Sequence, residues 1–202
     1  MSEPIQLGRV RRALAAAAST DLLRPRRAAV ALVLSPRREP SEGLSLLLMR
    51  RSERDGDPWS GHMAFPGGHA QSEDTDLLHT ARRETLEEVG LDLTSAEVLG
   101  RLDDVSPMKS SELVVRPYVF FAEHPTAPRL SDEVAEVLWV SLDELASGAW
   151  KRTAEVVIRG SRYTVPAFVI GSRVVWGMTY HLLERLLAQI SAEADDLGDP
   201  TR

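Results

Sequence analysis

Short apolar runs separated by helix-breaking residues constrain this chain more than any other feature. Residues 27–35 (RAAVALVLS) and 44–50 (LSLLLMR) are apolar and short, and Pro36, Pro40 and Gly43 lie between them. Such runs are typical of buried strands joined by a loop. The same reasoning predicts strands over residues 96–105, 112–122, 136–140, 155–160, 163–171 and 173–176. A sheet is therefore expected at the centre of the fold.

Residues 75–89 are expected to form a helix beside this sheet. The segment contains neither glycine nor proline, Asp74 is available as its N-cap, and Gly90 is suited to end it. At about 100° per residue, its buried face is predicted to hold Leu78, Ala81, Thr85, Leu86 and Val89.

Three further helices are predicted. Ser141 and Glu144 form a capping box that opens a short helix, and residues 177–194 are amphipathic. Near the N-terminus, apolar residues recur at helical spacing at Leu7, Val10, Leu14 and Ala17. The arginine and alanine content of RVRRALAAAAST also fits a transit peptide, but the helical spacing favours a docked amphipathic helix.

The pattern indicates a single α/β or α+β domain, with a mixed sheet and helices on its faces. We expect an N-terminal helical extension over residues 1–26, the folded domain over 27–195 and a frayed tail over 196–202. Residues 51–73 are rich in glycine, proline, serine and charge. That composition predicts a long irregular segment, of a kind usually kept for function.

Composition excludes several kinds of chemistry. The chain has no cysteine, so disulfides, zinc–thiolate sites and thiol catalysis are ruled out, and any metal must bind oxygen or histidine. A reducing, cytoplasmic location is expected on the same ground. No apolar run approaches the roughly 18–20 residues that a bilayer span requires, so we expect no membrane association.

Charge is divided unevenly along the chain. Residues 1–54 hold 11 arginines against 5 acids, while the remainder holds 13 basic residues against 25 acids. The basic region is either a scatter of solvated arginines or a rim that attracts a phosphorylated small molecule. A nucleic-acid partner is not favoured, because basic and aromatic residues do not interleave and the isoelectric point is about 5.4.

Carboxylates gather on one face of the predicted helix. In RETLEEVGL, residues 83–91, the side chains of Glu84, Glu87 and Glu88 share an arc about 100° wide beside the apolar stripe. Glu84 and Glu88 stand at i and i+4, where like charges repel unless something neutralises them. Arg83 can pair with one carboxylate, and the others can gather a hard divalent cation such as Mg²⁺. A solvated, charged helix face is the alternative.

Gly67 and Gly68, followed by RETLEEVGL, resemble the Nudix box. Its pattern is Gly, five residues, Glu, seven residues, Arg-Glu, an aliphatic, any residue, Glu-Glu, any residue, Gly and an aliphatic. Thr85 stands at the first aliphatic position, and nine residues separate Glu73 from Arg83. The first acid is therefore either Glu73 or Asp74. The resemblance implies an α/β/α sandwich with a mixed β-sheet, from about residue 27 to 190.

The resemblance also implies roles for individual residues. Glu84, Glu87 and Glu88 would bind Mg²⁺ or Mn²⁺, Arg83 would orient a glutamate, and Glu87 and Glu88 would serve catalysis. The main-chain carbonyl of Gly67 or Gly68 could complete the coordination. The chemistry agrees, because hydrolysis of a diphosphate needs charge neutralisation and an activated water, and glycines let the phosphate approach closely.

A longer stretch, LLMRRSERDGDPWSGHMAFPGG, is similar to the signature of Nudix coenzyme A pyrophosphatases. The positions that agree are Leu47, Leu48, Arg51, Ser52, Gly61, Phe65, Pro66, Gly67 and Gly68. Met49, Glu53 and Asp57 depart from it, and Asp57 replaces an arginine. The segment VVWGMTYHLLERL, residues 174–186, also resembles the closing part of these proteins.

Charged and aromatic residues near the glycines are candidates for substrate binding. Arg50, Arg51 and Arg54 could hold a substrate phosphate through bidentate contacts. His62 and His69 flank the glycines and could contact phosphate or act as general acid, or they could simply be exposed.

Two further residues complete the predicted site. Trp59 could stack on an adenine or serve as a packing anchor. Glu133 lies before the strand at 136–140, where family members often place a metal ligand or general base. Asp132 and Glu136 compete with it for that role.

These features predict a metal-dependent hydrolase that splits a diphosphate bond in a small-molecule nucleoside diphosphate derivative. Coenzyme A or acyl-coenzyme A is one substrate, and its products would be 3′,5′-ADP and phosphopantetheine. ADP-ribose, dinucleoside polyphosphates and nucleoside triphosphates are alternatives. A nucleotide-binding sensor without catalysis is the alternative from another class, and a homodimer is one open oligomeric state.

Overall fold

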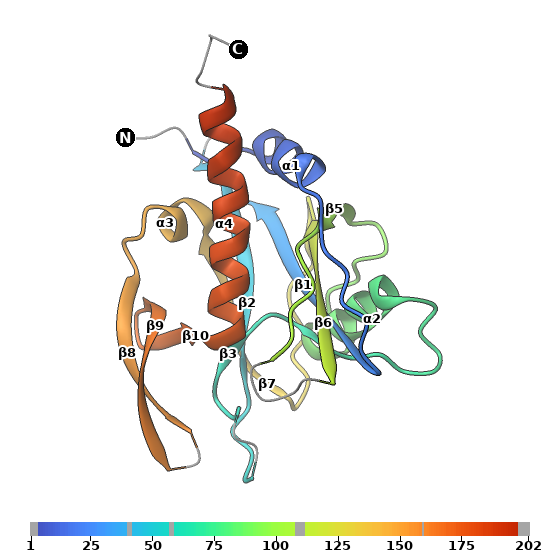
Figure 1. Ribbon diagram of the computed structural model, residues 1–202, viewed down its shortest axis with the longest axis vertical. Coiled ribbons are helices and arrows are strands. Elements are labelled where there is room, and N and C mark those ends of the chain that lie inside the picture. Colours follow the sequence, from blue (N-terminus) through green and yellow to red (C-terminus); the bar gives the residue numbers. More distant parts are fainter. Residues whose placement is uncertain (1–3, 40–41, 57–58, 108–111, 159, 198–202) are drawn as a thin grey trace.

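A computed structural model describes residues 4–39, 42–56, 59–107, 112–158 and 160–197. Its elements, labelled in Figure 1, are α1 (Leu7–Ala16), β1 (Arg26–Pro36), β2 (Leu44–Arg51), β3 (Met63–Ala64), β4 (Gly67–His69), α2 (Leu77–Val89), β5 (Glu97–Arg101), β6 (Leu113–Phe121), β7 (Val134–Ser141), α3 (Leu142–Ala146), β8 (Lys151–Ile158), β9 (Ser161–Ile170), β10 (Arg173–Trp176) and α4 (Gly177–Leu197). The predicted mixed sheet is confirmed.

The larger sheet has the order β3-β2-β1-β6-β5, with β7 paired to β2 and β4 paired to β1. Strand β1 runs parallel to β6 and antiparallel to β2 and β4. It also changes partner along its length. Ala28, Ala29 and Val30 pair with β4, whereas Leu34, Ser35 and Pro36 pair with β2. We call this opening between β1 and β2 the fork.

The segment from β3 to β4 fills the fork. Met63 pairs with Arg50 of β2, and Ala31 of β1 donates its backbone N–H to the carbonyl of Pro66 at 2.9 Å. Phe65, within this segment, is buried in the core that also contains residues of α1 and α4. Residues 51–73, predicted to be irregular, therefore contain two short strands, because β1 and β2 supply them with hydrogen-bonding partners.

Helices cover both faces of the larger sheet, with α1 and α4 on one face and α2 on the other (Figure 1). Alternate residues of β2 enter different cores, since successive strand residues point to opposite faces. Leu46 and Leu48 join the core beneath α1 and α4, while Leu47 and Met49 join the core beneath α2. The predicted α/β/α sandwich is confirmed.

Helix α2 starts later than predicted, and its buried face is rotated towards Leu77, Thr80 and Glu88. Its N-cap is Asp76, whose side chain accepts the backbone N–H of His79 at 2.7 Å, and not Asp74. Gly90 ends the helix at φ 69°, as predicted. Leu86 is 50% exposed, contrary to the prediction, because it lies at the edge of the apolar arc and the sheet does not reach it.

The predicted N-terminal helix, α1, packs beside α4 on one face of the larger sheet. Val10 and Leu14 of α1 are buried in the same core as α4. Arg12 pairs with Glu193 at 2.7 Å, and Arg11 pairs with Glu97 of β5 at 2.6 Å. The amphipathic spacing of this helix is thus used for packing.

The second, smaller sheet has the order β10-β9-β8. Its inner residues Phe168 and Val175 are fully buried in the core under α4, so the sheet is joined to the rest of the fold. Helix α4 runs through Leu197, three residues beyond the predicted end at 194. Of the predicted frayed tail, residues 198–202 lie outside the described residues.

Candidate active site

Two carboxylates of α2 face the glycines of β4. Glu88 Oε2 accepts the backbone N–H of Gly67 at 2.8 Å. Gly68 lies so close to Glu84 that a Cβ built on the glycine would stand 2.5 Å from Glu84 Oε1. Glycine is therefore required at position 68 if the Glu84 carboxylate is to keep this place. The glycines and glutamates of the sequence motif therefore also lie side by side in the structure.

Burial raises the pKa of both carboxyl groups. For Glu88, desolvation is the largest effect and raises the pKa to about 7, although the hydrogen bond from Gly67 opposes it. Desolvation is also the main cause of a raised pKa at Glu84, where Arg83 opposes it. Each anion is thus held where water solvates it poorly, which favours the arrival of a positive charge.

Arg83 holds this corner of the site together. Its Nη1 donates to Glu84 at 2.9 Å and to Glu87 at 3.0 Å, and its Nη2 donates to the carbonyl of His69 at 3.1 Å. On the other side it forms two hydrogen bonds with Asp74, whose side chain is almost wholly buried. Hydrogen bonding to Arg83 is the main reason that the pKa of Asp74 lies far below its usual range.

Asp74 is one of the two candidates for the first acid of the motif, and it lies in the segment before the helix. It is tied to Thr80 at 2.8 Å as well as to Arg83, so it serves as an anchor for the arginine rather than as a helix cap. Glu73, the other candidate for the first acid, is exposed. Thr85, which stands where an aliphatic was expected, is fully buried, and its hydroxyl is satisfied by donating to the carbonyl of Ala81 at 2.7 Å.

Two charged residues from other segments, Arg51 and Glu133, approach Glu88. The charge of Arg51 lowers the pKa of Glu88, and the charge of Glu133 raises it, so both lie near that carboxyl. Glu133 pairs with Arg54 at 3.1 Å, and both side chains are about half exposed. The backbone N–H of Ser52 donates to the carbonyl of Glu133 at 2.8 Å, which joins the two loops.

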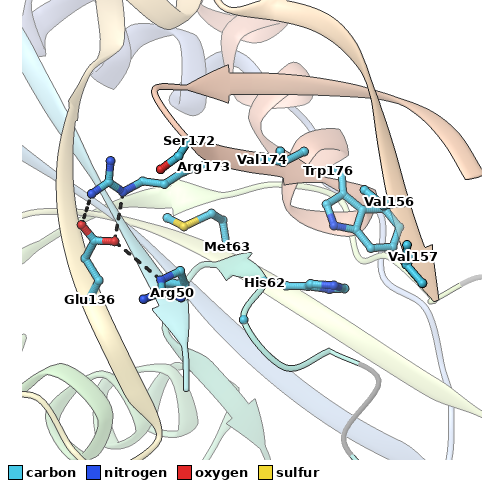
Figure 2. Close-up of a pocket in the computed structure, with 11 residues that line it drawn as sticks. Arg50, His62, Met63, Glu136, Val156, Val157, Ser172, Arg173, Val174 and Trp176 are labelled. Atoms are coloured by element: carbon cyan, nitrogen blue, oxygen red, sulfur yellow. Dashed lines mark hydrogen bonds and ion pairs between the residues drawn. The ribbon is translucent and has the colours of Figure 1, made fainter. Parts of the chain in front are cut away.

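Other predicted site residues lie elsewhere. Arg50, the neighbour of Arg51 on β2, points to the opposite face of the sheet and lines a separate pocket with His62 (Figure 2). Trp59 lies beside His62, with ring centroids 5.9 Å apart. The side chain of His69 is exposed and interacts with Arg26 at 3.2 Å. Asp57 lies outside the described residues.

Several residues of the pocket were not predicted. Trp176 and Arg173 contribute to it from β10, and Glu136 forms an ion pair with Arg173. Glu136, a competing candidate for the general base, is thereby assigned to an ion pair. The sequence carried one signal for this region, since residues 174–186 resemble the closing segment of coenzyme A pyrophosphatases.

A family description of the NUDIX domain matches residues 24–159. The chain belongs to the Nudix family. The mitochondrial coenzyme A diphosphatase NUDT8 of Homo sapiens is 36% identical over 179 residues, which cover 87% of this chain and 74% of that protein. The uncharacterized Nudix hydrolase NudL of Pectobacterium atrosepticum is 33% identical over 150 residues, covering 73% and 76% of the two chains. The predicted family and enzyme class, a Nudix pyrophosphohydrolase, are confirmed.

Solved structures agree on the fold. The crystal structure of a Nudix hydrolase from Alicyclobacillus acidocaldarius matches 85% of this chain and 93% of that chain, with a TM-score of 0.54 and 19% identity. Within the described part of the Nudix chain, no helix is both long and apolar enough to cross a membrane.

Proposed function

We propose that this Nudix enzyme hydrolyses the diphosphate linkage of coenzyme A or acyl-coenzyme A, with Mg²⁺ or Mn²⁺, to 3′,5′-ADP and (acyl-)phosphopantetheine. The observation that carries the reaction is the pair of desolvated carboxylates, Glu84 and Glu88, facing Gly67 and Gly68. Support for the substrate comes from the similarity to the NUDT8 diphosphatase and from the signature around residues 47–68. A cytoplasmic location and the homodimer remain predictions.

The donor set fits a hard divalent cation. Glu84, Glu87 and Glu88, with the carbonyl of Gly68, are oxygen ligands of the kind that Mg²⁺ and Mn²⁺ prefer. In the described residues, no three His, Asp or Glu side chains already stand at metal-binding spacing. Mg²⁺ commonly uses only one or two carboxylates together with waters and substrate phosphates, so a preformed cage is not required. The bound ion would supply positive charge to the phosphate oxygens and the attacking water.

The chain's own residues have separate tasks in this proposal. Arg83, anchored by Asp74, fixes Glu84 and Glu87. The N–H of Gly67 holds Glu88 in one orientation. Arg51 contributes positive charge beside Glu88, where a diphosphate would lie, and Arg54 does so beside Glu133. Glu88 and Glu133 are the two candidates to accept the proton of the attacking water.

A substrate panel tests the proposal. Purified protein is incubated with Mg²⁺ or Mn²⁺ and with coenzyme A, acetyl-coenzyme A, ADP-ribose, a dinucleoside polyphosphate or a nucleoside triphosphate. The products are then separated and identified by mass spectrometry. We expect the highest kcat/KM for a coenzyme A species, with 3′,5′-ADP and phosphopantetheine as products. EDTA should abolish turnover.

Other results would assign the site differently. A higher kcat/KM for another member of the panel would keep the hydrolase and replace the substrate. Tight binding of one member without turnover of any member would identify a sensor. Glu88→Gln serves as the matched inactive variant, because Gln keeps the shape of the side chain and removes its charge.

A further inference from the structure

A pocket of about 520 Å³ lies on the face of β2 opposite Arg51. It opens between the end of β2, strand β7 and the smaller sheet, and Figure 2 shows that its lining divides into two ends. A cluster of ionised side chains stands at one end and an aromatic and aliphatic wall at the other, with Met63 between them. A ligand that fills it would need both a charged and a flat apolar part.

The charged end carries an excess of positive charge. Arg173 Nε donates to Glu136 Oε2 at 3.0 Å, and Arg50 Nε lies 3.6 Å from the same carboxylate. Two guanidinium groups therefore share one carboxylate within the lining. Glu53 lies 4.0 Å from Arg50, but its side chain is 76% exposed and screened by water. An anionic group of a ligand would therefore pair with Arg173 and Arg50, which share only one carboxylate in the lining.

The opposite end offers flat aromatic surface. The ring of Trp176 lies 5.0 Å from that of His62 and 6.1 Å from that of Trp59. Val156 and Val157 of β8 stand beside Trp176 (Figure 2), and Val157 is 59% exposed. A planar heteroaromatic ring gains more from such a wall than a flexible chain does, because it stacks without losing conformational freedom.

Part of this pocket is built by the chain that follows the family match. The match ends at residue 159, whereas Arg173 and Trp176 come from β10. The hydroxyl of Thr179, in the first turn of α4, donates to the carbonyl of Met63 at 3.3 Å. That bond ties the added segment to β3, beside the fork. The catalytic carboxylates and this pocket thus lie on the two sides of one strand end.

We propose that this pocket binds the nucleotide half of the substrate, with the base stacked on Trp176 and a phosphomonoester of the ribose held by Arg173 and Arg50. The proposal rests on the proposed function, since it takes the diphosphate to lie at Glu84 and Glu88 and the nucleotide to extend around the end of β2. Trp176 and Arg173 are then specificity residues that take no part in the hydrolysis itself.

Binding without turnover tests this directly. Calorimetric titrations in EDTA use adenosine 3′,5′-bisphosphate, adenosine and phosphopantetheine as probes. Arg173→Gln should raise the Kd of the bisphosphate by about tenfold or more and leave that of adenosine nearly unchanged. Trp176→Leu should weaken both by about tenfold, and Trp176→Phe should restore most of the loss. Arg152→Gln, which removes an exposed arginine of β8 outside the pocket lining, should change neither.

The direction in which Glu136→Gln changes the Kd of the bisphosphate separates a binding role of the arginines from a structural one. Glu136→Gln removes the carboxylate that competes for the two arginines, so it should lower the Kd of the bisphosphate. If the ion pair served only to support the pocket, Glu136→Gln and Arg173→Gln would both weaken binding, and the proposal would be overturned. Circular dichroism melting curves identify any variant that fails to fold.

Kinetics connect the pocket to the reaction and keep the two proposals distinct. Arg173→Gln should lower kcat/KM for coenzyme A, mainly through KM, while leaving that for 3′-dephospho-coenzyme A nearly unchanged. Hydrolysis of coenzyme A that is insensitive to Arg173 and Trp176 would sink the pocket assignment and leave the function standing. If binding depends on both residues but coenzyme A is not hydrolysed, the pocket assignment would stand and the proposed function would fail. Binding of phosphopantetheine that depends on Trp176 would assign the pocket to the other half.

Discussion

Glu88 illustrates how one residue can be costly for folding and useful for chemistry. Its carboxylate is largely desolvated, and its one hydrogen bond from Gly67 does not compensate fully, so its pKa rises to about 7. The folded state then binds the proton more tightly than the unfolded chain does. Without metal, the charge on Glu88 therefore reduces stability increasingly as the pH rises from about 4.5 through 7, and the whole penalty is present above 7.

Glu88→Gln should remove that penalty. In EDTA at pH 8, we expect its free energy of unfolding to exceed that of the wild type by up to about 3 kcal/mol, and the two to converge near pH 4. Its kcat should fall by at least about 100-fold. Urea unfolding at both pH values gives the first quantity. Glu87→Gln is the control, because Glu87 is 55% exposed and should leave stability almost unchanged. A less stable Glu88→Gln protein at pH 8 would contradict this account of Glu88.

The two glycines of β4 should respond differently to alanine. Gly67 has φ 152°, and a Cβ there would stand 2.3 Å from the carbonyl oxygen of Ala29, so Gly67→Ala should disrupt β4 and lower the melting temperature strongly. At Gly68 the Cβ would meet the end of the Glu84 side chain, which can rotate away. Gly68→Ala should therefore reduce kcat by at least about tenfold while changing stability by less than about 1 kcal/mol. Thermal melts and steady-state kinetics distinguish the two, and equal melting temperatures would refute the assignment.

At the scale of elements, the segment between α1 and β1 is fastened to the β5–β6 region by one buried carboxylate. Asp104 accepts two hydrogen bonds from Arg116, at 2.8 and 2.7 Å, and one from the backbone N–H of Leu22 at 2.9 Å. Its own N–H donates to the carbonyl of Thr20 at 3.0 Å. Burial alone would raise the pKa of Asp104, but these bonds outweigh it and hold that pKa below its ordinary value.

Asp104→Asn should destabilise the protein by about 3 kcal/mol at pH 7, because it leaves Arg116 without a buried counter-charge. The stabilising contribution of Asp104 is present above the pKa of an unfolded aspartate, about 4, and is lost as the pH falls through its lower folded value. Melting temperatures of wild type and variant should therefore converge between pH 4 and 2. The more exposed Asp103, changed to Asn, should show a much smaller difference at pH 7. A gap that persists at pH 2 would mean that the charge of Asp104 is not its source.

At the scale of the whole molecule, the smaller sheet is part of one cooperative unit. Phe168 of β9 is fully buried in the core shared with α1 and α4, and its ring lies 5.2 Å from that of Tyr180. Phe168→Ala should lower the free energy of unfolding by about 3 to 5 kcal/mol in a single transition. Calorimetry checks this, with Tyr163→Ala on the exposed part of β9 as control. A separate early transition in Phe168→Ala would show that the smaller sheet unfolds alone.

The charge asymmetry of the sequence does not become a bare basic rim in the fold. Arg11, Arg12, Arg37, Arg50 and Arg54 each pair with a carboxylate. Most of these partners come from distant parts of the chain, so the positive first quarter is partly neutralised by the acidic remainder. Attraction of a phosphorylated ligand therefore depends on where single arginines stand rather than on the net charge of the segment.

Local patterns predicted those features that local physics decides. The longer strands of the larger sheet follow from periodicity, and the glycine end of α2 and the gathering of its glutamates follow from helix geometry. That Asp76 rather than Asp74 caps α2 could not be predicted, because both suit an N-cap. Only the position of Arg83 in three dimensions decides between them. The burial of Thr85 was predicted by its phase, and the exposure of Leu86 required knowing where the sheet ends.

The candidate site was predictable only in part for the same reason. Glu84, Glu88 and Gly67 are close in sequence, and one helix and one turn bring them together. Strands β3 and β4 were missed because their partners β1 and β2 lie far away in sequence. The contact between His62 and Trp176 depends on how the smaller sheet folds back, which no short-range pattern encodes.

The fork between β1 and β2 has a consequence for redesign. The stretch from Arg51 to His62 leaves β2 and returns to it where the Arg51 N–H donates to the His62 carbonyl at 3.0 Å. Arg51 and Arg54 of this stretch approach Glu88 and Glu133, whereas Gly67, Asp74 and Arg83, which position Glu84 and Glu88, lie outside it. Grafting other sequences between Arg54 and His62 should therefore change ligand choice while the hydrolytic residues are retained, which makes the enzyme modular at this point.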